Sequence, residues 1–211
     1  MSLFITLEGP EGSGKSSAMA IVYDLLAKDG YQIIKTREPG GTPISEQIRN
    51  VILDKENTAM DLRTEALLFA ASRRQHLVEK VWPSLKEGKL VFCDRFLDSS
   101  LSYQGYARGL GIDNVLNINL FATENTFPNL TLLFDVDVEI GLERIAKNQE
   151  REVNRLDVEK LEFHKKVRQG YLELAKRYPE RIVIIDASKP LEEVSYSTYT
   201  IIKETLQKHG L

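Results

Sequence analysis

The sequence predicts an α/β protein in which a parallel sheet lies between layers of helices. Short runs rich in apolar and β-branched residues indicate its strands: Phe4–Leu7, Gln32–Thr36, Leu90–Cys93, Leu130–Asp135 and Ile182–Asp186. Segments with helical spacing alternate with these runs; two of them contain Leu62, Ala66, Phe69 and Arg73, and Phe163, Val167, Tyr171, Leu174 and Tyr178. Because near-continuous apolar runs suit strands that are covered on both faces, we expect a three-layer sandwich with right-handed βα crossovers.

Composition and length favour one globular domain over residues 1–211. Of these residues, 42% are hydrophobic and 28% are charged, which is close to globular averages. A net charge of -3 argues against a protein that coats nucleic acid. No stretch approaches the roughly 20 apolar residues that span a bilayer. Since Cys93 is the only cysteine and Met1 opens no signal sequence, we expect a cytoplasmic protein without membrane contact.

A phosphate-binding loop follows the first predicted strand. The motif G-x-x-x-x-G-K-S/T lies between that strand and the helical segment Ala18–Lys28, which is the context that the motif requires. Glycines let the loop turn its backbone N–H groups toward phosphate oxygens, and the helix N-terminus adds positive potential. We expect Lys15 to reach the β- and γ-phosphates of ATP and Ser16 to bind Mg²⁺. The residues expected to contact ATP are Gly9, Pro10, Glu11, Gly12, Ser13, Gly14, Lys15, Ser16 and Ser17.

Nucleotide binding alone leaves three classes of protein open. A GTPase-type switch needs a guanine-reading element such as N-K-x-D, which this sequence lacks. A non-enzymatic nucleotide-binding module does not need a second, arginine-rich anion site. Such a site is indicated at the ends of the second and third strands, which favours a kinase.

Several motifs together resemble the thymidylate kinases. They are E-G-x-E-G-x-G-K, T-R-E-P-G-G-T, L-F-A-x-x-R, D-R-Y/F and S-x-x-Y-Q-G, in this order, followed by the region around Arg155. The resemblance therefore covers nearly the whole chain. It implies a P-loop fold with five parallel strands in the order 2-3-1-4-5, an active homodimer, and transfer of the γ-phosphoryl group of ATP to dTMP with Mg²⁺.

The resemblance also implies a site for the base and sugar of dTMP. Phe69 and Arg73 are four residues apart on one helical face, so a pyrimidine could stack on the phenyl ring while the guanidinium donates to a base carbonyl. A core phenylalanine beside a surface arginine is the structural alternative. Gln104 offers an amide to thymine N3. Tyr103 matches the tyrosine that disfavours a 2′-hydroxyl, although it could equally pack a short helix. Ser99 and Ser100 complete the expected dTMP contacts.

Arginines are the expected holders of the dTMP phosphate. A planar guanidinium grips phosphate oxygens through two parallel hydrogen bonds, and Arg95, Arg37 and Arg49 follow or flank the strand ends. Arg49 lies on a helix for which Thr42 suits the N-cap and Pro43 the first position, and a solvated helix arginine is the alternative. Glu38 is expected at the same site, with a cis peptide bond to the proline that follows it as a candidate.

Two carboxylates have expected roles. Glu11 is unfavourable beside ATP phosphates, so we expect it to face the acceptor sugar or a bound cation, as the loop carboxylate of the thymidylate kinases does. Asp94 ends the third strand and is expected to bind Mg²⁺ through water or to accept from Ser16. A structural ion pair with a neighbouring arginine is the alternative for Asp94.

A polar segment, residues 147–157, is the expected lid. Some thymidylate kinases carry a catalytic arginine in the P-loop, but Gly12 occupies that position here, which resembles the bacterial type with lid arginines. We therefore expect Arg151 and Arg155 to stabilise the transferring group and Arg144 to contact ATP. A kinase of another monophosphate, such as dUMP or CMP, is the nearest alternative, because thymine discrimination by its methyl group is weak.

Overall fold

The computed structural model describes residues 2–147, 155–156 and 159–211. A parallel, five-stranded sheet runs through its centre in the order β2-β3-β1-β4-β5, which confirms the predicted topology. The strands are β1 Phe4–Glu8, β2 Ile33–Arg37, β3 Leu90–Asp94, β4 Leu130–Asp135 and β5 Ile182–Asp186. The first three strands each end one residue later than expected, so Glu8, Arg37 and Asp94 belong to the sheet itself.

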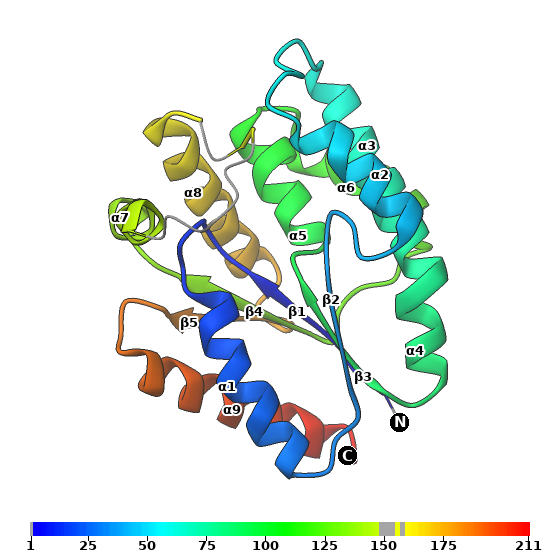
Figure 1. The fold of residues 1–211 in the computed structure, drawn as a ribbon, viewed down its shortest axis with the longest axis vertical. Coiled ribbons are helices and arrows are strands. Elements are labelled where there is room, and N and C mark those ends of the chain that lie inside the picture. The colour runs from blue at the N-terminus through cyan, green and yellow to red at the C-terminus, as the bar shows by residue number, and fades with distance from the viewer. Residues whose placement is uncertain (1, 148–154, 157–158) are drawn as a thin grey trace.

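Helices cover both faces of the sheet (Figure 1). Two of them, α1 Lys15–Lys28 and α9 Leu191–Lys208, pack together on one face. The remaining helical segments are α2 Pro43–Leu53, α3 Leu62–His76, η1 Leu77–Val81, α4 Trp82–Lys86, α5 Leu97–Ser100, η2 Leu101–Ala107, α6 Ile112–Thr123, α7 Val138–Lys147 and α8 Leu161–Arg177. Among the described residues, no helix is both long and apolar enough to span a bilayer.

Alternation along the central strands explains the two cores. In β1, Ile5 and Leu7 join the core beneath α1 and α9, whereas Phe4 joins the core on the opposite face. Every residue of β1 is buried, which accounts for its continuous apolar character. The charged residues Glu8, Arg37 and Asp94 lie at strand ends, where the sheet can present them to a ligand.

The entry into α2 follows its sequence signals. Thr42 is the extended N-cap residue and Pro43 occupies the first turn, as predicted. The Thr42 hydroxyl donates to Ser45 Oγ at 3.0 Å rather than capping a backbone N–H. The N-terminus of α2 sets the direction of this helix, and with it the position of Arg49, which lines a cavity.

The segment that carries Tyr103 and Gln104 is wound as a π-helix, η2, and not with the α-helical pitch that the spacing predicted. It continues directly from α5 and packs against α6 and α8. Single turns of π-helix recur at functional sites because they re-aim side chains. Here the wider turn buries Tyr103 and Gln104 while both still line a cavity.

Candidate active site

The phosphate-binding loop has the expected shape. Gly9, Gly12 and Gly14 have φ of 139°, 70° and 80°, values that favour glycine. Lys15 begins α1 and turns its Nζ back into the loop, donating to Gly9 O, Pro10 O and Ser13 Oγ at 3.2 Å each. Burial, followed by repulsion from Arg95, lowers the pKa of Lys15 to about 8. The loop thus holds the Lys15 ammonium, and its pKa responds to nearby charges.

Gly12 lies against the start of α7. A Cβ built at Gly12 would lie 2.0 Å from the backbone oxygen of Gly141, so no larger residue fits there without moving α7. This contact gives a steric reason for the absence of a P-loop arginine at position 12. Any arginine that stabilises the transferring group must come from elsewhere.

Arg95 follows β3 and turns toward the same loop. Its φ of 66° lies in the left-handed region, which is uncommon for arginine and typical of functional sites. Nη2 donates to Glu11 Oε1 at 2.6 Å, and Nη1 donates to Gly9 O and to the Tyr171 hydroxyl at 3.0 Å each. Burial alone would lower the pKa of Arg95, but the Glu11 carboxylate holds it well above its usual value.

The other expected phosphate ligands, Arg37 and Arg49, converge on one carbonyl. Both donate to Pro39 O, at 2.9 and 3.0 Å. The Glu38–Pro39 peptide bond is cis, as the sequence suggested. Arg37 also pairs with the exposed Glu46 carboxylate at 3.0 Å. The two guanidiniums therefore stand on the same wall as Glu38.

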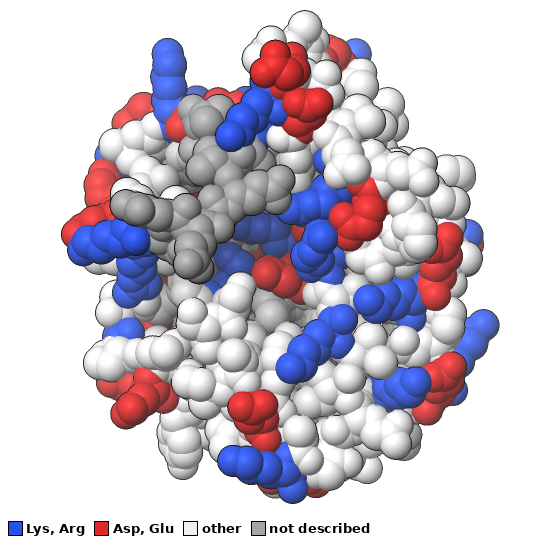
Figure 2. Space-filling model, in the orientation of Figure 1, with Lys and Arg blue, Asp and Glu red and all other residues white. Residues whose placement is uncertain are grey.

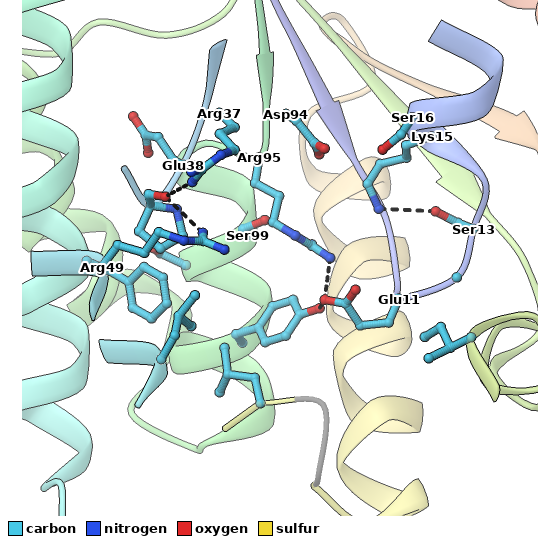
Figure 3. A pocket seen from close by; sticks show the side chains of 18 of the residues that line it. Glu11, Ser13, Lys15, Ser16, Arg37, Glu38, Arg49, Asp94, Arg95 and Ser99 are labelled. Atoms are coloured by element: carbon cyan, nitrogen blue, oxygen red, sulfur yellow. Dashed lines mark hydrogen bonds and ion pairs between the residues drawn. The ribbon is translucent and has the colours of Figure 1, made fainter. Parts of the chain in front are cut away.

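Donor and acceptor groups line one cavity of about 490 Å³, within the range of about 300–1,000 Å³ typical of small-molecule sites. Figure 2 shows basic side chains around a hollow, and Figure 3 shows the side chains of Lys15, Arg95 and Glu11 pointing toward one another. The predicted residues that line this cavity are Glu11, Gly12, Ser13, Gly14, Lys15, Ser16, Ser17, Arg37, Glu38, Arg49, Phe69, Asp94, Arg95, Ser99, Ser100, Tyr103, Gln104 and Arg144. Gly9 and Pro10 contribute carbonyls that hold Lys15.

Comparison with known proteins agrees with this geometry. The family model described as thymidylate kinase matches residues 7–197. The chain is 61% identical to a thymidylate kinase of Clostridium novyi (strain NT) over 191 residues, covering 90% of this chain and 93% of that protein. The chain belongs to the thymidylate kinase family. A thymidylate kinase of Geobacillus sp. (strain WCH70) is 54% identical over 204 residues, with 97% of both chains covered.

A solved structure in the thymidylate kinase family shares the fold. The crystal structure of thymidylate kinase from Ehrlichia chaffeensis superposes with a TM-score of 0.76 at 31% identity and covers 95% of this chain and 98% of that chain. Its agreement over nearly the full length shows that the sheet order and the surrounding helices belong to the family fold.

On the expected base side of this thymidylate kinase fold, the burial of Arg73 contradicts the alternative of a surface arginine beside a core phenylalanine. Phe69 is half-buried and lines the cavity, whereas Arg73 is 1% exposed and does not. Arg73 Nε donates to Glu38 Oε2 at 2.8 Å, Nη1 donates to Ser100 Oγ at 3.1 Å, and Nη2 donates to the Phe96 carbonyl at 2.8 Å. Arg73 thus braces Glu38 and Ser100 in this structure, and its expected contact with a base stays a prediction.

The expected role of Arg155 at the transferring group also stays a prediction, because its contacts in this structure lie elsewhere. Its Nη2 donates to Glu65 Oε2 at 2.5 Å and its Nε donates to Ile52 O at 3.0 Å, and Arg155 does not line the cavity. Most of the expected lid, including Arg151, lies outside the described residues. Arg144 lines the cavity and donates to Ala187 O at 3.1 Å, on the donor side near the end of β5.

Two oxygen-bearing side chains fit the expected magnesium site. Ser16 and Asp94 both line the cavity, and within the described ranges no ion pair involves Asp94. Hydroxyl and carboxylate oxygens are ligands that suit Mg²⁺. The structural alternative for Asp94, an ion pair with an arginine, is thus not the arrangement seen among these residues.

Glu8 and Tyr171 hold site residues from behind the cavity, and neither was identified from the sequence. Glu8 is fully buried and accepts from Phe96 N at 2.8 Å, Ser99 Oγ at 2.6 Å and the Tyr171 hydroxyl at 3.0 Å. Burial, followed by the Asp98 charge, raises the pKa of Glu8 to about 7. The position of Glu8 at the end of the first strand was the signal in the sequence, but nothing linked it to Tyr171, 163 residues away.

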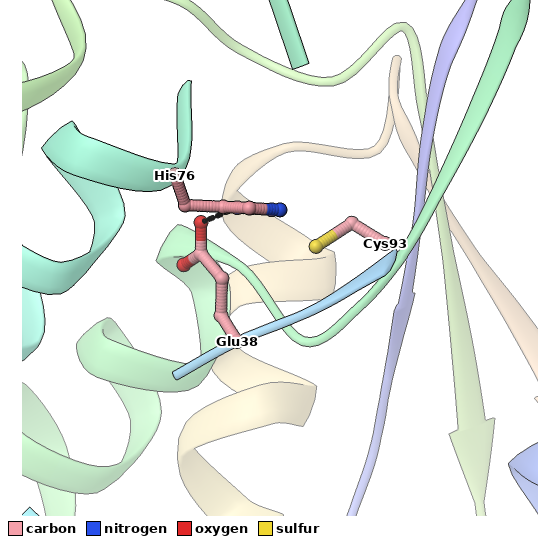
Figure 4. Close-up of side chains that lie close together, drawn as sticks. All are labelled: Glu38, His76 and Cys93. Carbon is pink, nitrogen blue, oxygen red and sulfur yellow. Dashed lines mark hydrogen bonds and ion pairs between the residues drawn. The ribbon is translucent and has the colours of Figure 1, made fainter. Parts of the chain in front are cut away.

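A second buried cluster, Glu38, His76 and Cys93, lies behind the cavity (Figure 4). His76 Nδ1 bonds Glu38 Oε1 at 2.9 Å and its Nε2 bonds Thr36 Oγ1 at 2.6 Å. The Cys93 thiol donates to Arg95 O at 3.0 Å, and burial raises its pKa. His76 therefore holds the Glu38 carboxylate from behind, and Cys93 bonds the backbone just after β3.

Proposed function

We propose that this chain transfers the γ-phosphoryl group of ATP to the 5′-phosphate of dTMP, forming ADP and dTDP. The supporting observation is that Lys15 and Arg95 line the same cavity and both donate to Gly9 O, while Glu11 is bonded to Arg95. The repulsion that lowers the pKa of Lys15 comes in part from Arg95, so the two cations are close enough to interact. Two polyanions can then meet across the strand tips.

In this mechanism the protein aligns two phosphates and balances their charge. A dTMP phosphate oxygen is ionised near neutral pH and attacks the γ-phosphorus in line, so no side-chain nucleophile is needed. Lys15 and the loop N–H groups hold the donor, and Arg95, Arg37 and Arg49 hold the acceptor. When phosphate replaces Glu11 as the partner of Arg95, the released Glu11 carboxylate faces the acceptor sugar beside Tyr103, whose hydroxyl donates to it at 3.2 Å.

A divalent cation would complete the donor side. Ser16 and Asp94 would hold Mg²⁺, either directly or through water. The cation would neutralise charge on the β- and γ-phosphates. Arg144 is the described guanidinium best placed to add positive charge on the donor side, because it lines the cavity from α7, the helix that packs against Gly12 of the P-loop.

We also propose that residues 1–211 act as one catalytic domain in a cytoplasmic homodimer. The family resemblance supports a dimer, as do exposed apolar side chains on packed elements: Phe121 of α6 is 89% exposed, and Leu67 of α3 and Val78 of η1 are also exposed. The free, buried Cys93 thiol suits a reducing compartment. Sedimentation of Phe121→Asp beside the unchanged protein tests the dimer.

A coupled assay of ADP release tests the activity. The protein is incubated with ATP, Mg²⁺ and, in turn, dTMP, dUMP, dCMP and no acceptor. Turnover that prefers dTMP over dUMP by roughly 10–200-fold supports the proposal. In a parallel incubation with GTP in place of ATP, hydrolysis without an acceptor would favour a switch, and nucleotide binding without turnover would favour a binding module. Lys15→Ala purified in parallel controls for contaminating kinases.

A further inference from the structure

Glu65 lies on α3, directly behind the residue expected to contact the pyrimidine. Gln104 Nε2 donates to Glu65 Oε1 at 2.8 Å, and each of the two residues is 1% exposed. Gln104 lines the cavity, whereas Glu65 does not. The carboxylate therefore contacts a base-reading group without being able to touch a base itself.

The chemistry of Glu65 decides which way the Gln104 amide points. In the described part of the chain, the Glu65 carboxylate accepts three hydrogen bonds: from Gln104 Nε2, from Arg155 Nη2 at 2.5 Å and from Arg108 Nε at 3.4 Å. A carboxylate only accepts, so the amide nitrogen of Gln104 must face it. The amide oxygen then faces away, and no donor in the described part of the chain bonds it.

We propose that Glu65 is a specificity-determining residue that makes the site select pyrimidines carrying an N3–H, and thus uracil-type over cytosine-type bases. This inference rests on the proposed function. A fixed amide oxygen accepts from the N3–H of thymine or uracil. Cytosine has a lone pair at N3, so two acceptors would face each other in a buried site, which is unfavourable.

The same geometry predicts what happens when Glu65 becomes neutral. Glu65→Gln has nearly the same size, and Arg155 would bond the new amide oxygen at the Oε2 position. The new NH₂ group would then face Gln104, so the Gln104 amide would turn over and present its own NH₂ to the cavity. That donor suits cytosine N3 and opposes the N3–H of uracil.

The ratio of kcat/KM for dUMP to that for dCMP is the measurement, because neither base carries the 5-methyl group. The unchanged protein should prefer dUMP by roughly 10²-fold or more. In Glu65→Gln the ratio should fall at least about tenfold, with the KM for ATP unchanged. Arg108→Gln is the matched control, because it also removes a partner of Glu65 but leaves the bond to Gln104; its ratio should stay within about threefold of the unchanged protein.

A double exchange, Glu65→Gln with Gln104→Glu, should restore the preference for dUMP. The carboxylate at position 104 would accept from the amide NH₂ at position 65. Its other oxygen would then again present an acceptor to N3 of the base. If Glu65→Gln fails to fold, the double exchange alone tests the proposal. A double variant that accepts dCMP as readily as dUMP overturns the proposal. An unchanged ratio in folded Glu65→Gln, or a ratio near one in the unchanged protein, also overturns it. Loss of all dTMP turnover in the unchanged protein would instead refute the proposed function.

Discussion

The donor and acceptor halves of the cavity are built in different ways. The donor half is built mainly from one short loop and the helix that follows it, with Asp94 and Arg144 beside them. Its lysine, Lys15, is bonded to carbonyls and a hydroxyl of that same loop. The acceptor half draws on β2, α2, α3, β3 and η2, and its arginines are paired with carboxylates: Arg95 with Glu11, Arg73 with Glu38 and Arg37 with Glu46.

This difference teaches that the acceptor half carries part of the stability of the fold and the donor half does not. A buried ion pair leaves an uncompensated charge when one partner is removed. A desolvated lysine with a lowered pKa is, in contrast, unfavourable in its charged form. Substitutions in the donor half should therefore lower activity alone, whereas substitutions in the acceptor half should also lower the free energy of unfolding.

The largest expected effect is on the donor side. Lys15→Ala should lower kcat by at least about 10³-fold, because the transferring group loses a charge that neutralises it. Below about pH 8 its free energy of unfolding should equal or exceed that of the unchanged protein, since the variant removes a buried cation. Single-turnover kinetics and urea unfolding measure the two quantities. A clear loss of stability would contradict the proposed contrast between the halves.

Glu38→Ala should destabilise the fold around the acceptor half of the cavity. It leaves Arg73 and His76 buried without their shared carboxylate and should lower the free energy of unfolding by about 3–5 kcal/mol. Glu46→Ala is the matched control, because its pair with Arg37 is exposed; its cost should stay within about 1 kcal/mol. Equal losses in the two variants would show that burial of the pair is not what matters.

Arg95→Ala should affect the acceptor with little effect on the donor. The kcat/KM for dTMP should fall by roughly 10²–10³-fold, while the KM for ATP changes little. Arg37→Ala should cost less, because its guanidinium is half-exposed and already shared between Pro39 and Glu46. Steady-state kinetics with each substrate varied in turn separate the two sites. A larger effect on the KM for ATP than for dTMP would place Arg95 on the donor side.

Arg155→Ala tests which half this arginine serves. An arginine that stabilises the transferring group would lower kcat by about 10³–10⁵-fold when removed. Its bond to Glu65 predicts instead a rise in the KM for dTMP with kcat within about tenfold of the unchanged protein. Kinetics with both substrates at saturating concentration distinguish these results. A loss confined to kcat would show that Arg155 acts on the donor side.

The smallest expected effect is on the pH dependence of ATP capture. Because the folded pKa of Lys15 is lowered to about 8, the charged form is present below that pH and is lost above it. The kcat/KM for ATP should therefore fall above about pH 8, whereas kcat should hold to higher pH, since bound phosphates favour the charged form. Lys15→Arg should lack this fall. A flat profile in the unchanged protein would contradict the lowered pKa.

The residue pattern predicted the parallel sheet and the donor loop, and the family resemblance implied the strand order. The loop could be predicted because its eight-residue motif is contiguous and its flanking strand and helix follow from local patterns. The residues lining the acceptor wall were also identified, but not their pairing. Phe69 and Arg73 share a helical face by spacing, yet Arg73 is the buried member and Phe69 the more exposed one.

Tertiary packing decided what the arginines bind. The partners of Arg73, Arg95 and Arg155 lie 35, 84 and 90 residues away in the chain. Spacing fixes which side chains share a strand end or a helix face, because those relations depend on the backbone repeat alone. Which buried carboxylate meets which guanidinium depends on how separate helices dock on the sheet, and that docking is set by the packing of the whole core.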